Sequence, residues 1–140
     1  MPLKQHTTNY TNTFIEVAED CPVTIAEIPK PKGNEKTAAL LQYEMIAKHP
    51  YKYTSDDVLF LVYAEKNDLT KAEYKKAREI FFSKGQPCFR ASPLTKRYGF
   101  GVHANEEGKI ALYAQNIEEY KKLIADPNIK KLKAMRSSRK

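Results

Sequence analysis

The sequence has no long apolar run, and this absence limits the classes of protein to consider. No window approaches the roughly 18 consecutive apolar residues of a membrane-spanning helix. The polar start, MPLKQHTTNYTNTF, also lacks the apolar core of a signal peptide. We therefore expect a cytoplasmic protein that does not enter a membrane.

Cysteine and histidine are scarce, which argues against disulfide and metal sites. Cys21 and Cys88 are far apart and each lies beside a proline, so they form neither a disulfide framework nor a CxxC zinc or redox motif. His6 and His49 have no companion at the spacing of metal ligands. We expect two free thiols, no bound metal and no cofactor.

Glycine-rich phosphate loops are also missing. The glycines of YGFGVH are not followed by a helix, as the dinucleotide-binding fingerprint requires, and no P-loop pattern occurs. These two common routes to nucleotide binding are therefore excluded.

The chain does have the length and composition of one small folded domain. Of its 140 residues, 41% are hydrophobic and 29% are charged, which suits a domain that buries a core without disulfides or metal. The net charge is +7, and the last twelve residues, IKKLKAMRSSRK, hold six basic and no acidic residues. We expect a single globular domain over 1–128 and a basic C-terminal segment over 129–140. That segment is either a solvated terminus or a contact for a phosphate-rich partner.

Two helix signals occur in the first half of the chain. Asn34 is placed to cap a helix over 35–49, which is stopped by Pro50. TSDD at 54–57 supplies a cap and two first-turn acids ahead of the apolar run 58–64. This run fits a helix or a buried strand, and the capping signal favours the helix.

Two further helix signals follow. TKAE at 70–73 matches a capping box, and the helix that it opens is predicted to end at Gly85. The core positions of that helix are predicted to be Tyr74, Ala77, Ile80 and Phe81. A last helix fits 117–125 with Asn116 as its cap, and the stretch after it fits either another helix or an edge strand.

The clearest β-structure signal is a hairpin over 98–104 and 109–115. Asn105 to Gly108 suit a type I turn closed by a glycine with positive φ, which places Asn105 opposite Lys109. An alternating strand over 13–18 is expected to join the hairpin. The predicted fold class is α+β, with a small antiparallel sheet packed against about four helices. In this register one hairpin face is apolar throughout: Tyr98, Phe100, Val102, Ile110, Leu112 and Ala114.

The second hairpin face is a candidate binding surface. Glycines in a strand mark the close approach of a ligand or of another part of the protein. A site edged by His103 and Tyr113 and a tightly packed helix are therefore both consistent with this face. Its residues are Gly99, Gly101, His103, Lys109, Ala111, Tyr113 and Gln115.

The preceding loop adds cationic and hydroxyl groups, because no acidic residue occurs from Ile80 to Asn105. Arginine and hydroxyl donors suit phosphate or carboxylate. We therefore expect an anionic ligand, either nucleic acid or a phosphate-bearing small molecule. The candidate ligand-binding residues are Arg90, Ser92, Lys96, Arg97, His103 and Tyr113.

Cys88 and a tyrosine-rich loop offer alternatives. Cys88 is a candidate nucleophile or redox centre, with His103 as the acid or base and Arg90 or Lys96 as the activating cation. A thiol between a proline and a phenylalanine is also an ordinary buried residue. HPYKYTSDD, at 49–57, alternates tyrosine with lysine, which suits either base stacking or surface packing.

Five stretches of the sequence resemble a family of small bacterial proteins known only as a domain of unknown function. The resemblance runs over nearly the whole chain from about Thr8 onward. It implies a free-standing single-domain protein and assigns no ligand or reaction to any residue. The stretches are TNTFIEVAEDCPV, PYKYTSDDV, FFSKGQPC, SPLTKRYGFGVHANEEGKIALY and KAMRS.

These observations favour a non-enzymatic module that binds an anionic ligand such as nucleic acid. A small-molecule enzyme or redox sensor that uses Cys88 and His103 is one alternative. A protein-interaction domain is the other.

Overall fold

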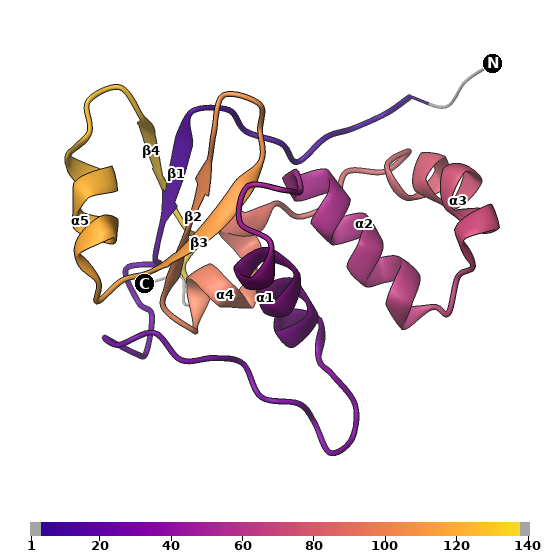
Figure 1. Cartoon of the computed structure of the whole chain (residues 1–140), viewed down its shortest axis with the longest axis horizontal. Coiled ribbons are helices and arrows are strands. Elements are labelled where there is room, and N and C mark those ends of the chain that lie inside the picture. The colour runs from indigo at the N-terminus through magenta and orange to yellow at the C-terminus, as the bar shows by residue number, and fades with distance from the viewer. Residues whose placement is uncertain (1–3, 138–140) are drawn as a thin grey trace.

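The computed structural model describes residues 4–137 and contains one four-stranded sheet with helices on both faces (Figure 1). The strands are β1 (Thr13–Glu16), β2 (Phe100–Ala104), β3 (Ile110–Ala114) and β4 (Lys130–Lys133), in the order β3-β2-β1-β4. β2 is antiparallel to both β1 and β3, whereas β4 runs parallel to β1. The predicted α+β class is confirmed, with a mixed rather than purely antiparallel sheet.

Five α-helices surround this sheet in the part of the chain that the structure describes. α5 lies on one side of the sheet and α1 and α4 on the other, while α2 and α3 extend away from it (Figure 1). None of these helices is both long and apolar enough to cross a membrane. The helices are α1 (Ala38–Lys48), α2 (Ser55–Lys66), α3 (Tyr74–Phe81), α4 (Pro93–Lys96) and α5 (Glu118–Ala125), with 3₁₀ turns η1 (Lys71–Glu73) and η2 (Phe89–Ala91).

The β2–β3 hairpin has the register predicted from its turn. The N–H of Asn105 donates to Lys109 O over 2.9 Å, and the N–H of Gly108 donates to Asn105 O over 3.0 Å. Gly108 has a φ of 80°, the left-handed geometry that favours glycine. A one-residue slip would exchange the two faces of the hairpin, so this turn determines which side chains enter the core.

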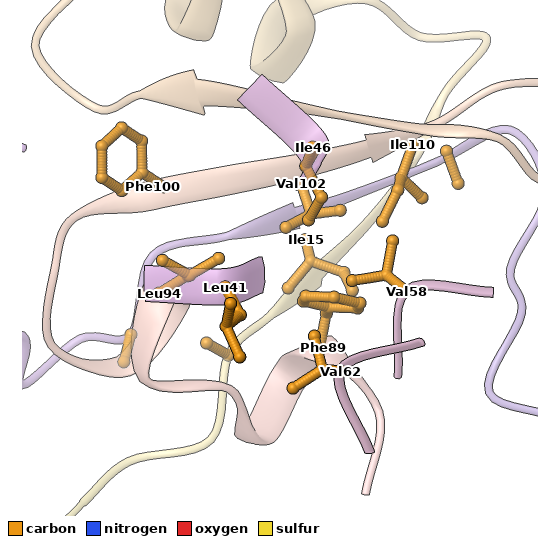
Figure 2. Close-up of a cluster of buried hydrophobic side chains, with 13 residues drawn as sticks. Ile15, Leu41, Ile46, Val58, Val62, Phe89, Leu94, Phe100, Val102 and Ile110 are labelled. Carbon is orange, nitrogen blue, oxygen red and sulfur yellow. The ribbon is translucent and has the colours of Figure 1, made fainter. Parts of the chain in front are cut away.

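The predicted apolar face of the hairpin forms part of the main hydrophobic core (Figure 2). Three strands supply one side of this core, and α1, α2 and the η2–α4 segment supply the other. Burying each large apolar side chain stabilises the fold by roughly 1.5–3 kcal/mol. The labelled core residues are Ile15, Leu41, Ile46, Val58, Val62, Phe89, Leu94, Phe100, Val102 and Ile110.

The second hairpin face is tightly packed around Gly101. Phe14 of β1 and Tyr120 of α5 pack over it, with ring centroids 5.0 Å apart. A Cβ added to Gly101 would lie 2.4 Å from Phe14 Cζ and 2.8 Å from Tyr120 Cε2. The glycine therefore permits close aromatic packing, which is the second of the two explanations that the sequence allowed.

α1 begins later than predicted, and Asn34 is not its cap. Thr37 Oγ1 accepts from the N–H of Leu40 over 3.2 Å. Asn34 instead lies in a tight turn in which Lys32 and Glu35 exchange backbone hydrogen bonds. Because the chain turns there, the helix starts at the next capping residue.

The apolar run 58–64 is helical and belongs to α2. Thr54 Oγ1 accepts from the N–H of Asp57, and Asp57 Oδ2 accepts from the N–H of Thr54, each over 3.1 Å. This reciprocal cap favours the helix over the buried strand.

α3 ends at Phe81 rather than Gly85. The capping box is present, since Thr70 N–H donates to Glu73 Oε1 over 2.8 Å, but its first turn is a 3₁₀ turn. Ile80 is 55% exposed, so its predicted core position is wrong. Phe82, just beyond the helix, is buried against Phe60 instead.

The structure corrects the predicted cap of α5 and shows which structure the stretch after α5 adopts. Asn116 does not cap α5, because its Oδ1 accepts from the N–H of Ala26 over 3.0 Å. Residues 130–133 form a strand beside β1, with Ala134 N–H donating to Glu16 O over 2.9 Å. This stretch is therefore the edge strand, one of the two possibilities that the sequence left open, and its backbone pairs with β1 on one side. Residues 138–140 lie outside the described residues.

Candidate functional site

The six predicted ligand-binding residues do not form one site. β1 lies between β2 and β4 in the sheet, so a residue of the hairpin does not reach the β4 edge. The loop cations Arg90, Lys96 and Arg97 belong to the η2–α4 segment, Ser92 is buried, and His103 and Tyr113 belong to the hairpin.

Arg90 joins the cationic loop to β4. Its Nε donates to Lys133 O over 2.8 Å, and its own O accepts from the N–H of Met135 over 2.7 Å. The neighbouring α4 is held at the same end of β1, because Thr95 O accepts from the N–H of Ala18 over 3.0 Å. The two basic stretches of the sequence therefore meet where β1 and β4 end.

We call the resulting cationic surface the basic edge. Three of its side chains are exposed and two are half-buried. Within residues 4–137 none of them forms an ion pair, since the pairs present there join Lys36 to Glu44 and Arg78 to Asp57. The basic edge consists of Arg90, Lys96, Arg97, Lys133 and Arg136.

Acidic residues near the basic edge neutralise only part of its charge. Glu16 lies beside Lys133 in the strand register. Asp20 accepts from the backbone N–H of Ser137 over 2.9 Å. With Glu19 and with Glu27, whose N–H donates to Tyr98 O beside Arg97 over 2.9 Å, these are four acids against five cations.

Ser92 is engaged inside the protein. It is 6% exposed, and its Oγ accepts from the N–H of Leu94 over 3.2 Å while donating to Gln42 Oε1 over 2.8 Å. Its hydroxyl therefore caps α4 and holds a buried amide, and does not join the basic edge.

His103 and Tyr113 belong to a hydrogen-bonded group centred on Tyr51. Tyr51 Oη lies 2.8 Å from His103 Nδ1 and 2.6 Å from Tyr113 Oη. Tyr51 has a φ of 58°, which is rare for a bulky residue, and its N–H donates to Ile110 O over 2.9 Å. The group therefore fixes the tyrosine-rich loop against β3.

Burial favours the neutral forms of His103 and Tyr51. Burial lowers the pKa of His103, although the charge of Asp126 opposes that shift. Burial and the hydrogen bond with Tyr113 raise the pKa of Tyr51. A neutral imidazole at His103 and a neutral phenol at Tyr51 are therefore expected near neutral pH.

Cys88 and His103 do not form the predicted pair. Cys88 Sγ lies 3.5 Å from Tyr10 Oη, and the adjacent Phe89 packs on the main-core face of the sheet. His103 is paired with Phe14 in the strand register, on the α5 face. The sheet separates the thiol from the imidazole, so His103 is not placed to act as its base. The hydrogen bond with Cys88 and burial raise the pKa of Tyr10.

Cys88 instead lines a cavity of about 220 Å³. Sequence reasoning missed Gln42, a polar residue of α1 that also lines it. The signal was available, because Gln42 lies three residues after Ala39 and four before Ile46, the spacing of one buried helix face. The lining residues are Gln42, Leu59, Phe81, Gln86, Pro87, Cys88, Ala91, Ser92 and Pro93.

No group of three or more His, Cys, Asp or Glu residues within 4–137 is arranged to hold a metal ion. The candidate sites in that part of the chain are therefore the basic edge, the Tyr51 group and the cavity beside Cys88.

Comparison with known proteins identifies a family but no activity. A family model described as "Family of unknown function (DUF6157)" matches residues 5–140. No curated protein and no solved structure matches the chain. The functional argument therefore depends on the geometry of the candidate sites.

Proposed function

We propose that this chain, which belongs to the family of unknown function DUF6157, binds the phosphate backbone of nucleic acid through its basic edge. The observation that carries the proposal is the hydrogen bond from Arg90 Nε to Lys133 O, which joins two basic stretches 43 residues apart in the sequence. Each stretch alone is an ordinary solvated cationic segment, whereas this hydrogen bond brings the two stretches side by side at one end of the sheet.

Arg90 is oriented before any ligand binds. Its Nε–H donates to Lys133 O, so the guanidinium plane is held while both terminal NH₂ groups keep their donors. These paired donors match two oxygens of one phosphate. Arg90 is therefore the expected anchor for a first phosphate.

The neighbouring cations favour a polymer over a single anion. Arg136 follows Met135, whose N–H is bonded to Arg90 O, and Lys133 is the last residue of the edge strand β4. A nucleic acid strand offers one phosphate per nucleotide and so pairs with several of these cations at once. Phosphate contacts carry no sequence information by themselves, so binding is expected to depend weakly on base sequence.

The test measures binding of fluorescently labelled single-stranded RNA and duplex DNA by anisotropy over a series of KCl concentrations. Affinity is expected to fall as salt rises, because each phosphate contact releases counterions. The double variant Arg90→Ala/Arg136→Ala should reduce the slope of log K against log salt by about 0.7 per lost contact on single strands and about 0.9 on duplexes.

Lys75→Ala/Lys76→Ala is the matched control, because it removes two charges from exposed positions of α3. It should leave the slope nearly unchanged. Binding that ignores salt, or an equal loss in both double variants, would show that the basic edge is not a specific contact surface. These point substitutions are preferable to deletion of 129–140, because that deletion removes β4.

A further inference from the structure

We propose that the cavity beside Cys88 binds a small uncharged molecule whose carbonyl oxygen accepts a hydrogen bond from the side-chain amide of Gln42. This proposal is independent of nucleic-acid binding and concerns a different ligand. The cavity is bounded by α1, α2, the end of α3, the loop 86–88 and the η2–α4 segment, which supply its lining residues.

Gln42 is a buried polar residue with unused hydrogen-bonding capacity. It is 8% exposed, and its Oε1 accepts from Ser92 Oγ over 2.8 Å. Its Nε2 carries two donors and makes no hydrogen bond with any residue of 4–137. No fully enclosed side-chain polar atom in that range lacks a partner, so these donors reach the cavity space. Buried amide donors are normally paired, and here the partner must come from the cavity.

Ser92 determines which way the Gln42 amide points. Because Ser92 Oγ already accepts from the N–H of Leu94 over 3.2 Å, its hydroxyl proton is available to Gln42. Only the amide oxygen accepts that proton. Oε1 therefore faces Ser92, which leaves Nε2 as the atom that a ligand meets.

The rest of the lining determines the class of ligand. None of the lining residues is charged. An ion that enters the cavity would lose its hydrating water and gain no opposite charge in exchange, which is unfavourable. The walls are mostly apolar, with Leu59, Phe81, Pro87 and Pro93. These features select an uncharged molecule that presents an acceptor to Gln42 and a compact apolar part to the walls.

The size of the cavity limits this molecule further. Its volume of about 220 Å³ is smaller than the 300–1,000 Å³ of typical drug-sized pockets. At about 30 Å³ per water molecule, it corresponds to about seven waters. N-ethylsuccinimide, a small ring with two carbonyls and an ethyl group, has the required chemistry and serves as the probe.

The first experiment follows the side-chain amide resonances of ¹⁵N-labelled protein during titration with N-ethylsuccinimide. The Gln42 pair is assigned by its loss in Gln42→Glu, which keeps an oxygen for Ser92. It should shift and saturate with a millimolar dissociation constant, as expected for a ligand of about ten heavy atoms. The Gln115 amide, whose Nε2 donates to Val23 O over 2.7 Å away from the cavity, should not move.

The second experiment uses the two thiols as reporters. Cys88 lines the cavity, whereas Cys21 packs against the Phe14 and Tyr120 cluster on the other face of the sheet. N-ethylsuccinimide should slow the alkylation of Cys88 by N-ethylmaleimide, measured by peptide mass spectrometry, and leave Cys21 unaffected. In Gln42→Met, the concentration that gives half protection should rise about tenfold, the effect of losing one well-formed hydrogen bond.

Circular dichroism melting establishes whether Gln42→Met folds. If it does not, Gln42→Glu takes its place in the protection assay, with the same loss expected because it also lacks the two donors. The proposal is overturned if the Gln42 amide does not shift, if Cys88 and Cys21 are protected equally, or if loss of the amide leaves protection unchanged.

Discussion

Replacing Gly101 by alanine tests whether aromatic packing closes the second face of the hairpin. The new Cβ would lie 2.4 Å from Phe14 Cζ and 2.8 Å from Tyr120 Cε2, where ordinary contacts begin at 3.4 Å. The Phe14 ring must therefore retreat by about 1 Å to restore ordinary packing. Phe14 is 0% exposed and Tyr120 is 7% exposed, and Tyr120 Oη accepts from the N–H of Val17 over 2.8 Å. Neither ring has free space to occupy.

The expected loss of stability in Gly101→Ala follows from two opposing effects. Overpacking a well-filled core costs roughly 1–3 kcal/mol, and a clash with two enclosed rings belongs in the upper half of that range. Alanine returns about 0.5–1 kcal/mol, because it reduces the conformational freedom of the unfolded chain. The net loss is about 2 kcal/mol, which lowers Tm by roughly 8 °C for a domain of this size.

Thermal and urea unfolding followed by circular dichroism measure this loss. Gly85→Ala is the matched control, because its Cβ would meet nothing within 4 Å, and it should be as stable as the parent or slightly more stable. Adding Phe14→Leu to Gly101→Ala removes the clashing ring atoms, so the double variant should lose less stability than the sum of the single losses. A Gly101→Ala protein that melts with the parent would refute the close packing.

Three further predictions concern local structure. Thr37→Ala should lower the free energy of unfolding in urea by about 1 kcal/mol through loss of the α1 cap, whereas Asn34→Ala should leave it unchanged; the reverse order would restore Asn34 as the cap. The pKa of His103 is lower in the folded protein than in the unfolded chain. The neutral side chain therefore contributes its full stabilisation above the unfolded pKa of about 6.5, and this contribution is lost as the pH falls through the folded pKa. His103→Gln should therefore flatten the decline in stability between about pH 7.5 and pH 5, and identical pH slopes would contradict this role. Tyr51→Phe should cost about 1–2 kcal/mol in urea unfolding and Tyr113→Phe less, because the latter keeps the bond between Tyr51 and His103; equal losses would argue against the shared network.

The hairpin could be predicted because its signals are local. Asn105 and Gly108 determine the turn, and alternation along each strand then assigns every side chain to a face. The capping box of Thr54 and Asp57 likewise indicated the start of α2. Because such features depend on residues only a few positions apart, they can be recognised in a single sequence.

What covers each face depends on distant residues. The clash partner of Gly101 is Phe14, on a strand near the other end of the chain, and no local pattern identifies it. Asn116 had the chemistry of a helix cap, but Ala26 competes for its side chain. KKLK at 130–133 has one apolar residue and resembles a solvated segment, although pairing with β1 makes it a strand.

The candidate site was predicted in part. The cationic character of the loop containing Arg90 follows from composition, but its neighbour β4 follows only from the fold. Ser92 and His103 were grouped with Arg90 because they are near it in sequence. Burial directs Ser92 to Gln42, and strand alternation places His103 on the far face of the sheet.

The position of β1 affects how the chain reaches its final state. Thr13 pairs with Ala104 on one side and with Lys130 on the other, so the two neighbours of β1 lie 91 (104 − 13) and 117 (130 − 13) residues later in the sequence. Pairing over such long separations slows folding. A chain that stops before Lys130 would leave one side of β1, with its buried Phe14 and Ile15, without a partner. Unpaired apolar edges recruit other chains, so C-terminal truncation is expected to yield aggregates rather than a smaller stable domain.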